Sequence, residues 1–170
     1  MRHAEALAIA ERVVEQLQPH CERIEIAGSL RRERLEVGDI EIVAIPKPYE
    51  VGLFESGIAT VVNQWPKVKG ELPCKYTQRV LPEGIKLDLF FARDENWGLI
   101  FAIRTGSADY SHKVLASRWA QLGYESRDGM LHNPQGHPIP IYSEAQLFSL
   151  LGLAHVPPFE REVNTIRYRE

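Results

Sequence analysis

Three acidic residues stand in settings that would present their carboxylates on the surface of a sheet. Asp39 and Glu41 lie two residues apart in an apolar run, and side chains two residues apart in a strand point to the same face. Asp88 lies in a second apolar run, from Ile85 to Phe91. Mg²⁺ prefers such oxygen ligands, and two ions roughly 3.5–4 Å apart can stabilise the attacking and leaving oxygens of a displacement at phosphorus. The three acids therefore predict a two-metal nucleotidyl transfer site.

A Gly-Ser turn with two arginines precedes the first pair of acids. Gly28 lets the backbone approach a phosphate closely, and Ser29 offers a hydroxyl and a backbone N–H. Residues 30–35 predict a short helix whose N-terminus would face the anion. Arg31 and Arg32 can make charge-assisted contacts to phosphate oxygens, but consecutive helical residues point about 100° apart. Only one of the two arginines is therefore expected to face the ligand.

The elements that must position these residues follow from apolar spacing and from proline and glycine breaks. Apolar residues at helical spacing predict a helix over residues 3–17, which Pro19 ends. The other elements predicted in this part are strands over 24–27, 39–45, 68–72, 75–81 and 85–92, and helices over 53–64 and 96–103. This mixture predicts an α+β fold in which the acids lie on adjacent strands.

The pattern changes after Gly106. A helix is predicted over 108–122, and turn-rich sequence over 124–141 predicts small strands. Ser143 and Gln146 match a capping box that opens a final helix. We therefore expect two parts, with a boundary near Gly106.

The order and spacing of these motifs resemble the nucleotidyltransferase signature of family X DNA polymerases, the DNA polymerase β group. The resemblance begins with the segments 28–32 and 38–41, which contain Gly-Ser, two arginines and Gly-Asp-x-acid. Residues 86–89 resemble the strand that carries the third catalytic aspartate of the family. Residues 105–107 resemble the Thr-Gly-Ser turn that closes the nucleotide pocket, and residues 151–162 resemble the end of the thumb. The matches span nearly the whole chain.

The resemblance implies a role for each matched position. Asp39, Glu41 and Asp88 would bind two Mg²⁺ or Mn²⁺ ions, and Asp88 would also activate the primer hydroxyl. Lys86 would bind DNA beside the primer phosphate. The residues that would bind the nucleotide are Gly28, Ser29, Arg32, Gly38, Thr105, Gly106, Ser107 and Tyr110.

The resemblance also implies an architecture and an activity. A nucleotidyltransferase palm with a mixed β-sheet and flanking helices would occupy residues 1–105, and a small α+β thumb would occupy residues 106–170. The implied activity is that of a monomeric, DNA-directed DNA polymerase acting on gapped or primer–template DNA in repair. It would add dNMP from a dNTP to a primer 3′ hydroxyl and release pyrophosphate. We expect neither a lyase domain nor a fingers region before the turn, and therefore distributive synthesis.

Three departures from the family pattern leave alternatives open. Glu41 stands where the polymerases usually have aspartate, a form that other nucleotidyltransferases use. Ile103 and Arg104 replace an aromatic pair that helps to exclude ribonucleotides, and Ser111 replaces an asparagine that contacts the base edge. One alternative is a template-independent, RNA or small-molecule nucleotidyltransferase. The other is a non-catalytic module that binds a nucleotide or a DNA end.

The overall charge argues against strong binding to bare duplex. The net charge is −3 and the sequence pI is about 6.1, whereas non-specific DNA binding depends mostly on neutralising phosphates. A local basic track is one interpretation of five residues, and a solvated sheet face is the other. These residues are Lys67, Lys69, Lys75, Arg79 and Lys86. We expect DNA binding to be weak and salt-sensitive.

The remaining composition favours a reduced, cytoplasmic setting. Cys21 and Cys74 are too few and too far apart to suggest a metal knuckle. The first residues lack the apolar core of a signal peptide, and no run approaches the length of a membrane span. We therefore expect no membrane partner.

Overall fold

The computed structural model describes residues 1–48, 57–162 and 168. The chain divides into two compact units, Met1–Ala92 and Arg93–Glu170. The sequence placed this boundary near Gly106. The helix at 97–105 belongs instead with the second unit, because Leu99 and Ala102 are buried in the apolar core of that unit.

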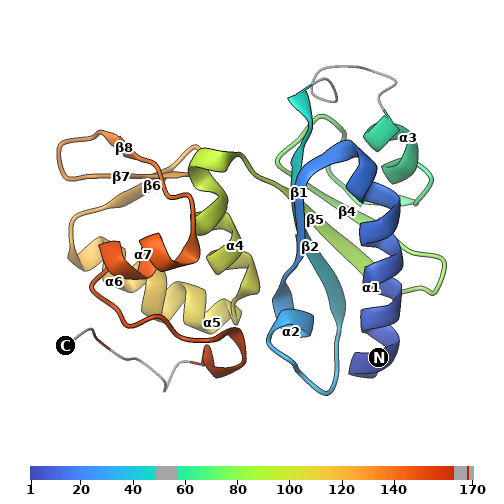
Figure 1. Ribbon diagram of the computed structural model, residues 1–170, viewed down its shortest axis with the longest axis horizontal. Helices are drawn as coiled ribbons and strands as arrows, with labels where there is room; N and C mark the ends of the chain where they lie inside the picture. Colours follow the sequence, from blue (N-terminus) through green and yellow to red (C-terminus); the bar gives the residue numbers. More distant parts are fainter. Residues whose placement is uncertain (49–56, 163–167, 169–170) are drawn as a thin grey trace. The chain divides into compact units, whose positions relative to one another are not determined.

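The first unit is built on a five-stranded mixed sheet (Figure 1), in agreement with the predicted α+β class. The strand order is β1-β2-β5-β4-β3, in which β2 and β5 are parallel and the other neighbours are antiparallel. The strands are β1 (Cys21–Ile26), β2 (Asp39–Pro46), β3 (Lys67–Lys69), β4 (Tyr76–Val80) and β5 (Lys86–Phe91). All five predicted strands are thus present, with shifted ends.

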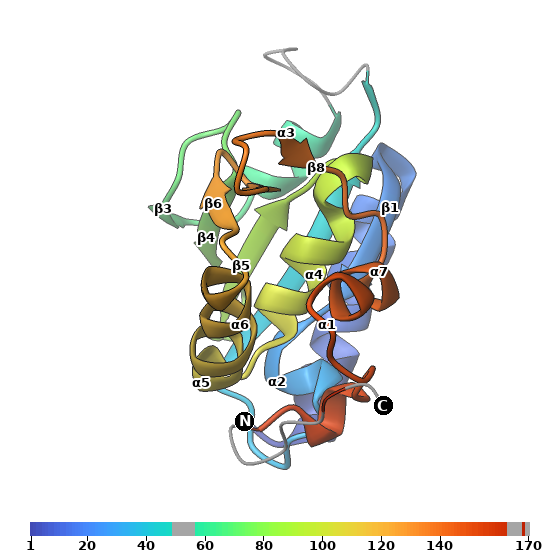
Figure 2. The same cartoon turned by 90° about the vertical axis from the view of Figure 1, so that its left-hand side faces the viewer.

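Helices cover one face of this sheet. They are α1 (His3–Leu17), η1 (Gln18–His20), α2 (Gly28–Arg31) and α3 (Gly57–Val62). The apolar stripe of α1 packs on the sheet in a core that α3 completes (Figures 1 and 2). Residues 53–56 of the predicted helix over 53–64 lie outside the described residues.

Two local predictions in this unit were wrong in extent. The helix expected over 30–35 is α2, which ends at Arg31 because Glu33 takes a left-handed conformation with φ 60°. The strand expected over 68–72 ends at Lys69 because Gly70 has φ 78° and packs tightly against the Tyr76 backbone. Each positive φ interrupts the regular hydrogen-bonding pattern at that point.

The second unit combines helices with a three-stranded sheet of order β6-β7-β8. The strands are β6 (Glu125–Arg127), β7 (Met130–His132) and β8 (Pro138–Ile139). The helices are η3 (Asp94–Asn96), α4 (Trp97–Thr105), α5 (Ala108–Tyr110), η4 (Ser111–Ala116), α6 (Ser117–Gln121), α7 (Glu144–Leu150) and η5 (Pro158–Glu160). The helix predicted over 108–122 is continuous through α5, η4 and α6, but η4 is π-helical. Half of the predicted capping box is present, because Ser143 Oγ accepts from the Gln146 N–H at 3.1 Å. Gln146 Oε1 accepts from the Tyr142 N–H at 2.8 Å rather than from the Ser143 N–H that a full box requires.

A buried ion pair fastens the chain after α7 to this core. Arg161 is 0 % exposed and donates to the carboxylate of Glu144 at 2.5 Å and to the Val156 carbonyl at 2.9 Å. Its guanidinium also lies over the Phe148 ring, 5.2 Å from the centroid.

Among the described residues, no helix combines the length and the apolar character that a membrane span requires.

Candidate active site

The register between β2 and β5 brings the predicted acids to one face. Asp39 is opposite Lys86, and Glu41 is opposite Asp88, on parallel neighbouring strands. Partners in register share a face of the sheet, and residues two apart on one strand share it too. Asp39, Glu41 and Asp88 therefore stand on the same face, together with Lys86.

The opposite face of the same strands fixes this arrangement. Ile40, Ile42, Leu87 and Leu89 alternate with the acids, are each 0 % exposed and form part of the core beneath α1. A slip of one residue in either strand would turn these side chains to the acidic face and bury the carboxylates. The apolar half of the pattern thus determines where the acids point.

The three carboxylates differ in exposure and environment. Asp39 is exposed, Glu41 is half-buried and Asp88 is only 7 % exposed. The pKa of Asp39 is raised, first by partial loss of hydration and then by repulsion from Asp88, and Lys86 opposes the rise. Asp39 and Asp88 are therefore close enough to interact, and protonating Asp39 or placing a cation beside it relieves the repulsion.

Asp88 is held by two side chains from β4 that the sequence analysis did not single out. Its Oδ1 accepts from the Tyr76 hydroxyl at 2.5 Å and from Gln78 Nε2 at 2.8 Å. Gln78 is opposite Asp88 in the ladder, and the Tyr76 ring stacks on Phe90 with centroids 4.8 Å apart. The available signal was that Tyr76 and Gln78 are two residues apart in a strand and so share a face.

The Gly-Ser turn lies against the acid strand. Gly28 begins α2 with φ 62°, and a Cβ at this position would overlap the Glu41 carboxylate. The neighbouring Ala27 N–H donates to the Glu41 carbonyl at 2.8 Å. The turn therefore approaches Glu41 as closely as glycine allows. Ser29 follows within α2.

Two further residues predicted to bind the nucleotide flank this turn in the first unit. Arg32 is half-buried at the C-terminal end of α2, and its N–H donates to the Gly28 carbonyl at 3.1 Å. Gly38 is exposed immediately before β2. Both positions follow the turn closely in the chain, and their contacts with a nucleotide stay a prediction.

The other predicted nucleotide-binding residues belong to the second unit. Thr105 is 0 % exposed at the end of α4, and Gly106 has φ 66° and a cis bond to Ser107. Ser107 caps α5, because its Oγ accepts from the Tyr110 N–H at 3.2 Å. Tyr110 is 1 % exposed in the core of this unit, and burial raises the pKa of its phenol. Grouping these four residues with the acids stays a prediction.

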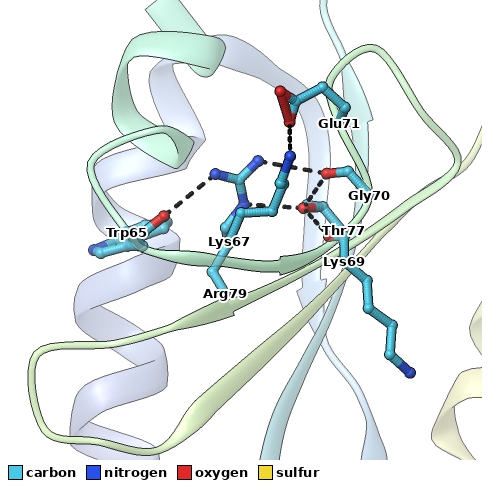
Figure 3. A network of polar contacts seen from close by, with 7 residues as sticks. All are labelled: Trp65, Lys67, Lys69, Gly70, Glu71, Thr77 and Arg79. Carbon is cyan, nitrogen blue, oxygen red and sulfur yellow. Dashed lines mark hydrogen bonds and ion pairs between the residues drawn. The ribbon is translucent and has the colours of Figure 1, made fainter.

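Arg79, one of the five residues of the possible basic track, is buried. Arg79 is 3 % exposed and donates to Thr77 Oγ1 at 2.9 Å and to the Trp65 and Gly70 carbonyls at 3.2 and 3.5 Å (Figure 3). It joins β4 to the chain around β3 rather than offering charge to a ligand.

The other four basic residues of that track are exposed. Lys67 pairs with Glu71 at 2.6 Å, and Lys69 points away from the Arg79 network (Figure 3). Lys75 and Lys86 are exposed as well. This arrangement favours a solvated sheet face over a continuous basic track.

No ready-made metal cluster stands out in the part of the chain that the structure describes. There, no three His, Cys, Asp or Glu side chains gather as a metal-binding group. The first unit also has a hollow of about 380 Å³ between α1 and β1, lined partly by Leu7, Val14, Ile24 and Ile26. Ile24 and Ile26 lie on the helix-covered face of the sheet, so this hollow is not part of the acidic face.

The chain was compared with known proteins. It matches none of the protein-family models, and no curated protein is significantly similar to it. Support for a function therefore comes from the residues of the site.

Proposed function

We propose that the protein is a metal-dependent nucleotidyltransferase of family X type, a DNA polymerase that adds dNMP to a primer 3′ hydroxyl. The observation that carries the proposal is the parallel register of β2 and β5. It brings Glu41 opposite Asp88 and puts Asp39 on the same face. The close approach of Gly28 to Glu41 adds a phosphate-holding turn beside the acids.

The chemistry of the donors fits divalent magnesium or manganese. Asp39, Glu41 and Asp88 offer only hard carboxylate oxygens. Loss of hydration and, after it, repulsion from Asp88 raise the pKa of Asp39, and a cation would relieve the repulsion. Lys86 is an exposed positive charge on this face, opposite Asp39. Metal bound to these acids would supply charge stabilisation to the attacking and leaving oxygens.

The chain's own residues have distinct roles in the proposed reaction. Asp88 accepts the proton of the primer hydroxyl while the hydroxyl oxygen forms a bond to the α-phosphorus of the nucleotide. The bond from that phosphorus to the bridging oxygen breaks, and pyrophosphate leaves. Ser29 and Arg32 bind the leaving phosphates, and Gly38 leaves room for them. Lys86 binds the primer phosphate.

The charge of the protein suits short, distributive synthesis. With a net charge of −3 and Arg79 buried, electrostatic attraction to duplex DNA is weak. A one-nucleotide gap gives the enzyme a defined primer end and a single base to copy. We therefore propose gapped DNA as the substrate and filling of short gaps in repair as the role.

Extension of a labelled primer on one-nucleotide-gapped DNA tests the proposal. The reaction contains Mg²⁺ or Mn²⁺ with dNTPs or NTPs supplied separately, and it compares the wild type with Asp88→Asn. Asp128→Asn is the matched control, because Asp128 is an exposed acid of the second unit with φ 52°, which asparagine also tolerates.

Three outcomes separate the alternatives. Templated dNMP addition that Asp88→Asn abolishes and Asp128→Asn preserves supports the polymerase. Untemplated or ribonucleotide addition identifies a terminal or RNA-directed transferase. Nucleotide binding without addition to any primer contradicts the polymerase, and leaves a small-molecule transferase or a binding module.

A further inference from the structure

We infer that Tyr76 and Gln78 are positioning residues for Asp88, which hold its Oδ1 so that Oδ2 is the oxygen presented to metal and to the primer hydroxyl. Both hydrogen bonds end on the same carboxylate oxygen, at 2.5 Å from Tyr76 and 2.8 Å from Gln78. This inference rests on the proposed function, because it gives Asp88 the role described above.

The need for such a restraint follows from the side chain of aspartate. Its terminal torsion joins an sp³ to an sp² carbon and is broad and roughly two-fold, so either oxygen can face a given direction. The backbone of Asp88 is fixed by β5 between two fully buried leucines, but this does not choose between the oxygens. Two donors on Oδ1 do choose, since a carboxylate offers about two lone-pair sites on each oxygen.

The two donors are themselves held firmly. Gln78 is the direct ladder partner of Asp88, so its reach to the carboxylate is set by the register of β4 with β5. The Tyr76 ring stacks on Phe90, with an interplanar angle of 19°, and its hydroxyl extends from this stack to Asp88. Arg79 lies on the opposite face of β4 and ties that strand to the chain beside it. The donors therefore stand on a braced strand, which is what precise positioning requires.

The consequence for the reaction is a separation of tasks between the two oxygens. Oδ1 takes up hydrogen bonds and keeps the carboxylate plane fixed, and Oδ2 is left for the reacting groups. Side chains that orient a metal-binding carboxylate typically change metal affinity or activity by about 10–100-fold when removed. Neither Tyr76 nor Gln78 needs to touch the nucleotide for this effect.

Tyr76→Phe is the sharpest test, because it removes one hydroxyl and keeps the ring that stacks on Phe90. Gln78→Leu removes the second donor with little change in volume. Tyr142→Phe is the matched control, since Tyr142 is 53 % exposed in the second unit. For each protein we would measure Mn²⁺ affinity by calorimetry without nucleotide, single-nucleotide kcat and KM, and the melting temperature.

The expected result is specific to positioning. Each of Tyr76→Phe and Gln78→Leu lowers kcat or Mn²⁺ affinity by about 10-fold. KM for dNTP and the melting temperature stay near those of the wild type, and Tyr142→Phe changes nothing. The double variant loses less than the product of the two single losses, because both donors hold the same oxygen.

Failure of this inference can be told from failure of the proposed function. If the wild type transfers nucleotides and both single variants keep its kcat and Mn²⁺ affinity, the positioning role is overturned and the proposed function stands. If the wild type transfers nothing, the proposed function fails, and the Mn²⁺ titrations still decide: weaker binding by the variants supports the positioning role. Equal binding, or no binding by the wild type, overturns it.

Discussion

Replacing Asp39 by asparagine should stabilise the metal-free protein at neutral to alkaline pH. The pKa of this carboxyl is raised above its ordinary value of 3.8 by partial loss of hydration and by the charge of Asp88. The folded protein therefore keeps this proton to a higher pH than the unfolded chain does. As a result, the free energy of unfolding falls as the pH rises from about 3.8 through the raised pKa. The substitution would remove this penalty because the asparagine amide carries no charge.

The magnitude is limited by the exposure of Asp39. Interactions between exposed charges are screened by water and salt, and contribute about 0–1 kcal/mol. We expect Asp39→Asn to raise the free energy of unfolding by roughly 0.5 kcal/mol, which is a rise of about 2 °C in melting temperature. Mg²⁺ should stabilise the wild type, because a ligand that binds only the folded state adds stability. It should leave the variant almost unchanged, because the substitution removes one of the three proposed metal ligands.

Thermal unfolding by circular dichroism, at low salt with a chelator, measures this effect at about pH 8 and at lower pH. Asp128→Asn controls for the loss of an acid elsewhere. The gap between Asp39→Asn and the wild type should narrow as the pH falls toward about 4. A variant that is no more stable than the wild type under the alkaline condition, or a gap that is independent of pH, would refute the reasoning.

Three further predictions concern contacts that hold the fold. Gly28→Ala should lower the free energy of unfolding by about 1–2 kcal/mol and abolish nucleotidyl transfer, since φ is 62° and the new Cβ would displace Glu41. Urea unfolding and primer extension measure the two effects, and wild-type stability and activity in the variant would contradict the prediction. Arg79→Ala should lower the free energy of unfolding in urea by about 3 kcal/mol, because it removes a buried side chain together with its three hydrogen bonds. Lys69→Ala at an exposed position should change stability by less than about 0.5 kcal/mol; equal effects would contradict the structural role of Arg79. Glu144→Gln should destabilise the second unit by about 3–5 kcal/mol, because the charge of Arg161 is then buried without its partner; calorimetric scans in which the variant melts like the wild type would count against it.

The acidic strands show how far the sequence could lead. Alternation of Asp39 and Glu41 with buried isoleucines predicted a strand with its acids on one face, and the structure confirms this arrangement. The same local pattern occurs around Asp88. Alternation is a local property, so it can be read without knowing which strands pair.

What the sequence could not reveal depends on pairing between distant segments. The acids were expected on adjacent strands, but the parallel direction of β2 and β5 and the register that puts Glu41 opposite Asp88 are properties of the whole sheet. Tyr76 and Gln78 acquire their role only once β4 is placed beside β5. Arg79 was grouped with surface lysines because its burial depends on carbonyls of Trp65 and Gly70.

One of the two edge strands of the first unit, β3, has a consequence for self-association. β3 is an edge strand, and an open edge is a template on which another chain can add a strand. Here the edge is three residues long, its register with β4 is irregular between Lys67 and Lys69, and both lysines are exposed on either side of Val68. A short strand, an irregular register and charged side chains each discourage edge-to-edge strand pairing between copies. Lys67 and Lys69, which suggested a nucleic-acid track, therefore oppose the pairing of copies at this edge of the sheet.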